Sequence, residues 1–428
     1  MYLPHWPVPH GSKDIILGLE RVKALLERLG NPEEKLPPVI HVAGTNGKGS
    51  TLAYLKAILE HAGYKVHRYT SPHIKQFNER IVLAGKEITD EYLSQVIEET
   101  RLAAGDLQTT FFEGSTAAAF LAFSRVKADV LLLETGLGGR LDATNIIDTP
   151  RLTVITPISE DHTEYLGNTI SAIAYEKAGI IKPKVPCVIS WQLQEAQEVL
   201  LKKCAEENAP NYSFDQHWNF EKTDTGFNFV DHIDKEIIPL PNPSLIGIHQ
   251  IINAATAVAA IKALDGFEVT YENICYGLTN TFWPARMQLI KHGVLHDMLP
   301  EAWELWVDGA HNNGGAQMLA ATIESLWHDK PTYLINGRTG NRDIKSFLAY
   351  FKDKVQLVCG VKVRSEPLGE LAINIVNGAK EIGLEAYECD SLPDAIKLIM
   401  QKSNQPSRIL VCGSLYLAAD VALANKQA

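Results

Sequence analysis

The stretch that decides the fold is Val39-Ile-His-Val-Ala-Gly-Thr-Asn-Gly-Lys-Gly-Ser-Thr51. It opens on a largely apolar run, continues through three glycines that surround a lysine, and closes on two hydroxyl side chains. From Ser50 to Glu60 the apolar residues then recur at helical spacing. The pattern predicts a buried strand, a tight loop and the start of a helix.

The loop has the composition of a phosphate site. Glycine has no Cβ and tolerates positive φ, so Gly44, Gly47 and Gly49 allow backbone N–H groups to approach phosphate oxygens. Lys48 can reach the phosphates, and the Ser50 hydroxyl can bind Mg²⁺. The usual P-loop spacing is incomplete, because its first glycine is missing and Gly49 separates the lysine from the serine. The alternative is a turn that only reverses the chain, and the helical spacing that follows argues against it.

The composition is that of a soluble globular protein with two domains. The chain has 428 residues, of which 46% are hydrophobic and 21% charged, and this length exceeds one ordinary core. A formal net charge of −11, with no run of lysine or arginine, argues against a nucleic-acid partner. The first ten residues lack the apolar segment of a signal peptide, and no later stretch is long enough to span a bilayer, so we expect a cytoplasmic protein with no membrane partner. The six cysteines form no CxxC pair, which indicates neither a zinc site nor a disulfide framework.

Strand and helix patterns alternate along the chain. A helix is predicted over 14–29, and strands are predicted over 64–69, 129–134 and 152–156 in addition to the phosphate strand. This alternation predicts an α/β fold, with a mostly parallel sheet of the P-loop ATPase type in a domain over residues 1–283.

The alternation of strand and helix patterns restarts after Trp283-Pro284, where the proline indicates a break between elements. Five further strands are predicted near Met287, Leu305, Tyr333, Leu357 and Leu410. We therefore predict a second, smaller Rossmann-like α/β domain over 284–428, which closes the catalytic cleft.

Three polar residues stand where strands or helices end. Glu134 ends a strand at the edge where a Mg²⁺ ligand would be needed, His162 follows the next strand, and Lys177 lies in the last turn of a helix. Each has an ordinary alternative: a solvated strand end, a surface histidine, and a lysine that favours a helix C-terminus.

Seven segments together resemble the folylpolyglutamate synthase and dihydrofolate synthase family of the Mur ligase superfamily, most closely its bifunctional bacterial members. They are His41–Ser50, Thr70–His73, Phe77–Arg80, Glu134–Asn145, Asp161–Glu164, Glu176–Ile180 and Asp308–Asn312. The resemblance runs from about Leu17 to Leu417. It implies a monomeric ATP-dependent ligase that phosphorylates a carboxylate of dihydropteroate or a reduced folate, and lets the amino group of L-glutamate displace the phosphate.

The resemblance also implies roles for individual residues. The residues expected to bind ATP are Thr45, Asn46, Gly47, Lys48, Gly49, Ser50, Thr51, Asn253, Arg286 and Asp308. Two Mg²⁺ ions are expected to be coordinated by Ser50, Ser71, Glu134 and His162, and K⁺ is a further candidate ion. The expected catalytic residues are Lys48, Glu134, His162, Lys177 and His311, and Lys177 is expected to be modified to a carbamate.

The substrate pocket is predicted from the same resemblance. Its residues are Ile15, Ile16, Leu17, Arg80, Thr110, Phe111, Phe112, Glu113, Leu141, Asp142 and Ala143. Phe112 could stack on a flat heterocycle, although a buried core phenylalanine explains it equally well.

Several positions depart from the family pattern. Glu160 replaces an apolar residue, Ala285 replaces a glycine, Asn313 replaces a proline, and 340–343 lacks the usual Asp-Lys-Asp. The alternatives are a monofunctional folylpolyglutamate synthase, a Mur-type ligase for another amino acid, and a catalytically inactive nucleotide-binding protein of the same fold.

Overall fold

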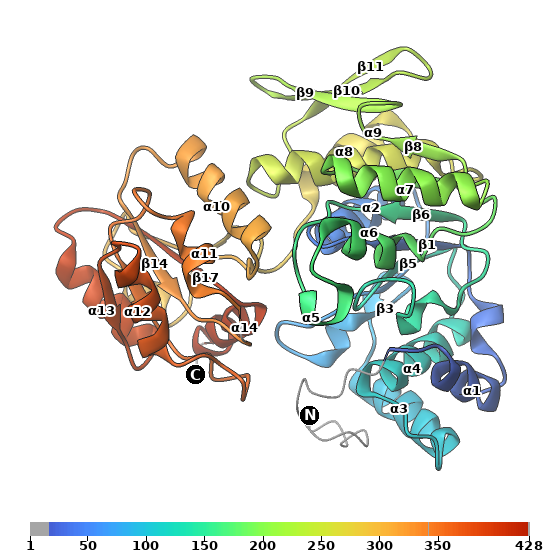
Figure 1. The fold of residues 1–428 in the computed structure, drawn as a ribbon, viewed down its shortest axis with the longest axis horizontal. Coiled ribbons are helices and arrows are strands. Elements are labelled where there is room, and N and C mark those ends of the chain that lie inside the picture. The colour runs from blue at the N-terminus through green and yellow to red at the C-terminus, as the bar shows by residue number, and fades with distance from the viewer. Residues whose placement is uncertain (1–16, 341, 427–428) are drawn as a thin grey trace. The chain divides into compact units, whose positions relative to one another are not determined.

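The computed structural model describes residues 17–340 and 342–426 (Figure 1). The chain divides into two compact units. Unit 1 contains the described residues up to Ser244 together with Gln250–Phe282, and unit 2 contains Leu245–His249 and the described residues from Trp283 onward. The main division falls one residue before the predicted boundary, and the short segment Leu245–His249 groups with the second unit instead of the first.

Unit 1 is built on an eight-stranded sheet with the order β4-β3-β2-β5-β1-β6-β7-β8. The strands are β1 (Val39–Ala43), β2 (Val66–Tyr69), β3 (Ile81–Leu83), β4 (Lys86–Glu87), β5 (Val130–Glu134), β6 (Leu152–Ile155), β7 (Cys187–Ile189) and β8 (Asn211–Ser213). From β2 to β8 all neighbours pair in parallel, and β3 and β4 add an antiparallel edge. The strand of the phosphate stretch, β1, lies between β5 and β6, so the carboxyl ends of all three meet at one edge.

Helices cover both faces of this sheet. They are α1 (Glu20–Arg28), α2 (Lys48–His61), α3 (Asp90–Ala104), α4 (Phe111–Arg125), α5 (Thr163–Leu166), α6 (Ile170–Ala178), α7 (Gln194–Glu206), α8 (Ile248–Ala263) and α9 (Tyr271–Asn280). Leu131 and Leu133 of β5 pack in one core cluster with α1, α3 and α4, whereas α6 and α7 pack with β6 and β7 in another. The central strands are buried along their whole length, as expected for a parallel sheet covered on both faces.

A separate antiparallel sheet lies apart from the main sheet of unit 1 (Figure 1). It contains β9 (Trp218–Lys222), β10 (Gly226–Asp231) and β11 (Glu236–Pro241) in the order β11-β10-β9.

Unit 2 has its own six-stranded sheet with the order β12-β13-β17-β14-β15-β16. The strands are β12 (Gln288–Ile290), β13 (Glu304–Val307), β14 (Thr332–Asn336), β15 (Val358–Gly360), β16 (Ala386–Glu388) and β17 (Arg408–Cys412), and the helices are α10 (Asn313–Leu326), α11 (Ile344–Ala349), α12 (Ala372–Glu381), α13 (Leu392–Lys402) and α14 (Leu415–Ala424). All pairs are parallel except β12 with β13. The mostly parallel α/β architecture predicted for both parts of the chain is confirmed.

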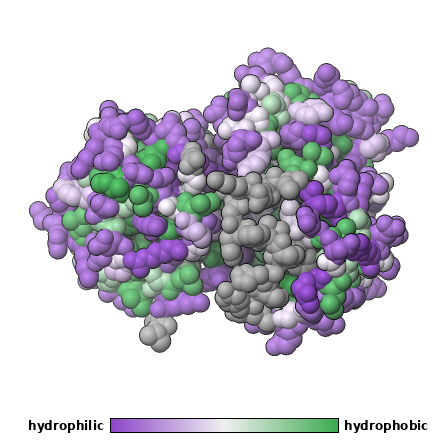
Figure 2. Space-filling view, turned by 60° about the horizontal axis from the view of Figure 1, so that its bottom comes forward, coloured by the Kyte–Doolittle hydropathy of each residue, from purple (hydrophilic) through white to green (hydrophobic). Residues whose placement is uncertain are grey.

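The surface is mainly hydrophilic in the view of Figure 2, where apolar side chains form small separate groups. In the described part of the chain, no helix combines the length and apolar character needed to cross a bilayer.

Candidate active site

The phosphate loop takes the predicted form at the carboxyl end of β1. Gly47 has φ +87° and directly precedes α2, whose first residue is Lys48. A Cβ on Gly47 would lie 2.2 Å from Oδ1 of Asn253, and a Cβ on Gly44 would lie 1.9 Å from Oγ1 of Thr156. Both glycines are therefore required by close packing, and the loop brings Asn253 of α8 against the start of α2.

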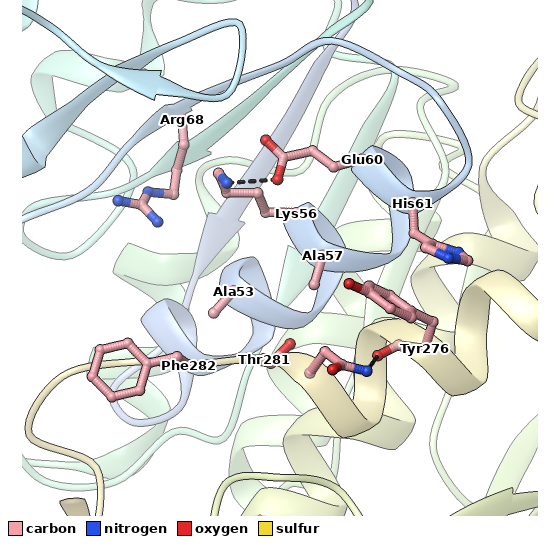
Figure 3. A pocket seen from close by; sticks show the side chains of 10 residues that line it. Ala53, Lys56, Ala57, Glu60, His61, Arg68, Tyr276, Thr281 and Phe282 are labelled. Atoms are coloured by element: carbon pink, nitrogen blue, oxygen red, sulfur yellow. Dashed lines mark hydrogen bonds and ion pairs between the residues drawn. The ribbon is translucent and has the colours of Figure 1, made fainter.

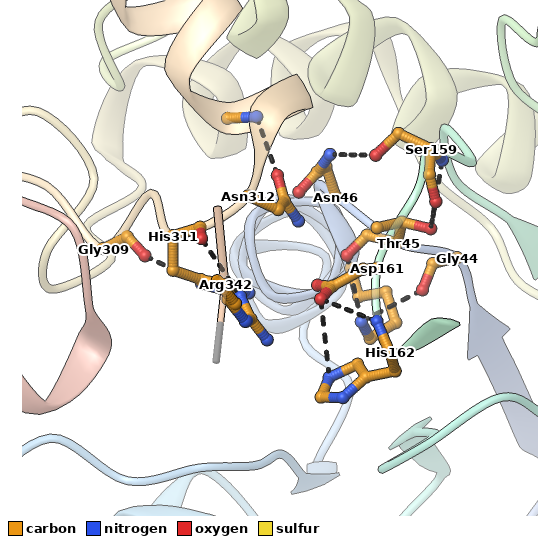
Figure 4. Close-up of polar contacts among 12 residues, drawn as sticks. Gly44, Thr45, Asn46, Ser159, Asp161, His162, Gly309, His311, Asn312 and Arg342 are labelled. Carbon is orange, nitrogen blue, oxygen red and sulfur yellow. Dashed lines mark hydrogen bonds and ion pairs between the residues drawn. The ribbon is translucent and has the colours of Figure 1, made fainter. Parts of the chain in front are cut away.

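The phosphate loop is hydrogen-bonded to the segment that follows β6 (Figure 4). The Thr45 hydroxyl donates to the carbonyl of Ser159 at 3.0 Å and accepts from its N–H at 3.1 Å. Nδ2 of Asn46 donates to Oγ of Ser159 at 3.0 Å. Thr45 and Asn46, which were predicted as ATP contacts, thus also fix the conformation of the loop.

Lys48 and Glu134 meet as the strand order requires. Nζ of Lys48 lies 3.9 Å from Oε1 of Glu134 and donates to the carbonyl of Gly44 at 3.1 Å. The N–H of Ser71 donates to the other oxygen of Glu134 at 3.1 Å. The buried Glu134 carboxylate is therefore shared by a cation and a backbone donor that belong to two other strand ends.

Two of the predicted metal ligands, Ser50 and Glu134, are buried. Among the described residues, the Ser50 hydroxyl is buried and has no hydrogen-bond partner. A buried hydroxyl without a partner is costly, and a bound cation would satisfy it together with the nearby carboxylate of Glu134. The described residues contain no group of three or more histidine, cysteine and acidic side chains around one point.

His162 is brought to the same edge of the sheet by β6 (Figure 4). Its backbone is left-handed, with φ +51°, a conformation that costs energy in a residue other than glycine. The Asp161 carboxylate accepts from the His162 N–H at 2.9 Å and lies 3.9 Å from the ring Nε2. The imidazole is 39% exposed and so remains open to a ligand, whereas Asp161 is nearly buried.

Lys177 lies in the last turn of α6, where a lysine favours the helix C-terminus, and it is also buried. Its side chain is 5% exposed, and Nζ donates to the carbonyl of Gly44 at 2.9 Å. Burial, and then repulsion by Lys48, lowers the pKa of Lys177 to about 7. The amine is therefore partly neutral near physiological pH and lies beside the phosphate loop.

Three of the predicted substrate residues have structural partners of their own. Asp142 is buried and accepts from the N–H groups of Gly136 and Leu137 at 2.9 and 2.8 Å, and burial raises its pKa. Thr110 caps α4 by accepting from the N–H of Glu113 at 3.2 Å, while Glu113 accepts from the N–H of Thr110 at 2.7 Å. These contacts shape the loops that a substrate would meet.

The aromatic residues of the predicted substrate pocket do not all lie together. The Arg80 guanidinium lies over the ring of Phe111 at 5.6 Å and donates to Nδ1 of His73 at 2.9 Å. Phe112 instead packs against Gly136, where a Cβ would lie 2.3 Å from its ring. Phe112 also packs against the hydrophobic core, which agrees with the core alternative, whereas Phe111 is 41% exposed.

The remaining substrate predictions concern short segments. Ala143 is buried and Leu141 is half-buried, next to Asp142. Leu17 is half-buried, and Ile15 and Ile16 lie outside the described residues.

In unit 2, Asp308 is buried at the end of β13. Its carboxylate accepts from the N–H groups of Met287 and Ala310, both at 2.8 Å, and burial raises its pKa. Ala285 has φ +53°, the left-handed region that favours the glycine expected there. Nη1 of Arg286 donates to the carbonyl of Ala285 at 2.8 Å, so the departure at Ala285 directly adjoins a predicted ATP contact.

His311 follows Asp308 on a loop whose backbone accepts hydrogen bonds from two arginines, of which Figure 4 shows Arg342. Its Nδ1 donates to the carbonyl of Gly309 at 3.1 Å. Its own carbonyl accepts from Nη2 of Arg338 at 3.2 Å and from Nη1 of Arg342 at 3.1 Å. The backbone of this predicted catalytic residue is therefore fixed from β14 and the loop that follows it.

Sequence reasoning missed two residues that organise these loops, Ser159 and Arg338. Ser159 comes shortly after β6 in unit 1, and Arg338 comes shortly after β14 in unit 2. Each lies at the carboxyl ends of the parallel strands of its own sheet. That position was the available signal, because polar side chains at such edges surround ligand sites in α/β sheets.

Comparison with known proteins places the chain in a family. The Mur ligase middle domain matches residues 42–261, and the glutamate ligase domain of Mur ligases matches residues 285–415. The dihydrofolate synthase/folylpolyglutamate synthase of Bacillus subtilis is 35% identical over 417 residues, which cover 94% of each chain.

Solved structures give the same result. The chain is similar to Escherichia coli FolC in complex with DHPP and ADP, with 33% identity, a TM-score of 0.86, and coverage of 96% of this chain and 94% of that chain. A bifunctional folylpolyglutamate synthase/dihydrofolate synthase with Mn, AMPPNP and L-glutamate bound is 31% identical, with a TM-score of 0.84 and coverage of 96% of this chain and 95% of that chain.

The two-unit fold, its phosphate loop and the two matched domains define a Mur-type ligase. Within that class, the chain belongs to the dihydrofolate synthase/folylpolyglutamate synthase family, as the seven sequence segments predicted.

Proposed function

We propose that this protein joins L-glutamate to dihydropteroate and to reduced folates, using ATP and a divalent cation. The observation that carries the proposal is the phosphate loop, where Lys48, the Ser50 hydroxyl and the Glu134 carboxylate gather at the carboxyl end of a parallel sheet. Relatives whose names state both ligations cover nearly the whole chain, and related structures hold ADP, DHPP and L-glutamate.

The reaction needs an activated carboxylate. A carboxylate is a poor acyl donor because oxide is a poor leaving group, so the γ-phosphate of ATP is first transferred to it. The loop N–H groups and Lys48 would hold the triphosphate and offset its charge. When bound, Mg²⁺ would neutralise phosphate charge, with Ser50 and Glu134 among the residues that hold it and with Ser71 and His162 as the further predicted ligands.

The second half-reaction is attack by the amine of L-glutamate. Nitrogen bonds to the acyl carbon, inorganic phosphate leaves, and the amine gives up a proton. Holding the acyl phosphate and the amine close together in the reactive orientation supplies much of the rate enhancement over the uncatalysed reaction, since oriented groups reach effective molarities of about 10⁵ M or more. A pair of Mg²⁺ ions, a K⁺ ion and the roles of Asn253, Arg286 and Asp308 toward ATP remain proposals drawn from the family resemblance.

The activity is tested by measuring ADP and phosphate release with dihydropteroate or tetrahydrofolate, each with and without L-glutamate. We expect glutamate-dependent turnover with both acceptors. Turnover with tetrahydrofolate alone would identify a monofunctional folylpolyglutamate synthase. Turnover with neither acceptor would reject the proposed substrates in favour of another amino-acid ligase or an inactive nucleotide-binding protein.

Glu134→Gln tests the site itself. We expect it to lower kcat at least about a hundredfold, because it removes a charged oxygen ligand beside the phosphates while keeping the shape of the side chain. Glu99→Gln is the matched control, since Glu99 pairs with Arg125 on the surface. Near-normal turnover of Glu134→Gln at saturating Mg²⁺ would show that the metal assignment is wrong.

A further inference from the structure

A pocket of about 440 Å³ lies between α2 and α9, wholly within unit 1 (Figure 3). Ala53 and Ala57, one helical turn apart on α2, line it with small methyl groups. Its volume is within the range of small-molecule sites, about 300–1,000 Å³. None of the residues around it has a role in the ligation proposed above.

Aromatic side chains border this pocket on the α9 side. Phe282 is 68% exposed and Tyr276 is 46% exposed. The Tyr276 ring stacks on His61 of α2 with centroids 3.8 Å apart. Large exposed rings beside a cavity offer flat apolar faces on which another ring can stack.

Cationic side chains border the opposite side of the pocket. Lys56 of α2 forms an ion pair with Glu60 at 2.6 Å, and Arg68 enters from β2. Among the residues that line the pocket, two are cations and one, Glu60, is a carboxylate, while Glu134, Glu87 and Glu79 also act electrostatically on Arg68. A guanidinium and an ammonium on one wall of a pocket can both donate hydrogen bonds to the anionic group of a ligand.

The pocket is distinct from the phosphate loop. Lys56 follows Lys48 by eight residues on the same helix, which is about 12 Å along its axis at a rise of 1.5 Å per residue. The phosphates of ATP at the start of α2 therefore leave this pocket open to a second ligand.

We propose that the pocket between α2 and α9 binds a small aromatic anion, a flat ring that carries one carboxylate or phosphate. The ring stacks on Phe282 or Tyr276, and the anionic group pairs with Arg68 and Lys56. Such a ligand contacts α2, which begins at the phosphate loop, and Phe282, the last residue of unit 1 before the chain enters unit 2.

The test uses the full chain loaded with Mg²⁺ and AMPPNP, so that the phosphate loop is occupied. Phenyl phosphate and benzoate are titrated in, and binding is followed by calorimetry. Inorganic phosphate and benzyl alcohol each carry one half of the proposed ligand and should bind more weakly. We expect Lys56→Gln and Phe282→Ala each to weaken the better probe about two- to tenfold, the scale of a single stacked ring or exposed ion pair.

Matched variants are available on other surfaces of unit 1. Lys202→Gln removes a lysine from another i,i+4 pair, Lys202–Glu206 at 4.0 Å, and Leu102→Ala removes an apolar side chain that is 65% exposed. Both should bind the probe like the unaltered protein. Equal affinity in all four variants, equal affinity for the half-ligands, or no binding of phenyl phosphate and benzoate up to about 20 mM would overturn the proposal.

Discussion

At the residue scale, Lys177 combines burial with an amine that is partly neutral at physiological pH. Burial, and then repulsion by Lys48, lowers its pKa to about 7, so part of the amine is unprotonated at that pH. A neutral amine adds to CO₂, forming an N–C bond and releasing one proton, and the resulting carbamate keeps an N–H for the carbonyl of Gly44. The product is an anion where a cation would repel bound Mg²⁺.

We predict that Lys177 carries CO₂ as a carbamate. With ¹³C-labelled bicarbonate, a carbamate signal should be present at pH 8 and should decline below pH 7, because protonation removes the nucleophile. Lys177→Ala should lose this signal and most activity, with partial rescue by short carboxylates. Lys182→Ala is the control, since burial also lowers the pKa of Lys182, and it should keep the signal. A fully active Lys177→Ala enzyme would contradict the prediction.

Arg338 offers a second prediction at this scale. Among the described residues, its buried Nε and Nη1 have no hydrogen-bond partner, while Nη2 donates to the carbonyl of His311 and the guanidinium lies 4.1 Å above Phe347. Burial lowers its pKa to about 10, so it remains a cation. A buried cation without a carboxylate partner contributes little to stability.

We therefore expect Arg338→Met to leave the free energy of unfolding within about 1 kcal/mol of the unaltered protein. The same variant should lower kcat about ten- to a hundredfold, because the loop of His311 loses one of its anchors. Arg338→Lys should restore part of the activity by keeping a donor. A large loss of stability with normal kcat in the folded fraction would show that the role of Arg338 is only structural.

At the element scale, the start of α4 is fixed by a reciprocal cap. Thr110 and Glu113 each accept from the backbone of the other, and Glu113 also pairs with Arg21 at 2.8 Å. Thr110→Ala should lower the free energy of unfolding by about 1–2 kcal/mol, measured by urea denaturation. Thr89→Ala is the comparison, since Thr89 caps α3 with a single contact from Tyr92, and it should cost less. If Thr110→Ala lowered the free energy of unfolding by the same amount as Thr89→Ala, or by less, the reciprocal cap would add no stability and the prediction would be wrong.

The sequence predicted those helices and strands that are long enough to show a repeating pattern of apolar residues. The apolar runs of β1, β5 and β6 were predicted from the sequence. Strands of three residues, such as β7, β8 and β16, are too short to show an apolar repeat. They form because neighbouring strands of the folded sheet pair with them, and the sequence pattern does not show those partners.

The candidate site was predictable where strand order alone brings residues together. Glu134 and His162 follow strands that flank β1, and the structure places them at the phosphate loop. The partners that hold these loops were not predictable, because Ser159, Arg338 and Asp142 act through local geometry that has no sequence period. Phe111 and Phe112 illustrate the same limit, since adjacent helix positions point in different directions.

At the scale of the whole molecule, each unit has a hydrophobic core of its own. Leu25 is fully buried in a cluster formed by α1, α3, α4 and β5 of unit 1. Leu348 is fully buried in a cluster formed by the sheet and helices of unit 2. Cores that share no residues can lose their packing separately, so we expect two unfolding transitions in calorimetry without nucleotide.

Leu25→Ala and Leu348→Ala form a matched pair for this prediction. Each removes the same atoms from a fully buried position and should destabilise its own unit by about 2–5 kcal/mol. Each variant should therefore lower the midpoint of one transition and leave the other in place. Mg²⁺ with AMPPNP should raise the transition that Leu25→Ala lowers, because the phosphate loop lies in unit 1 and a ligand stabilises the state that it binds. A single transition that both variants lower equally would show that the two units unfold as one.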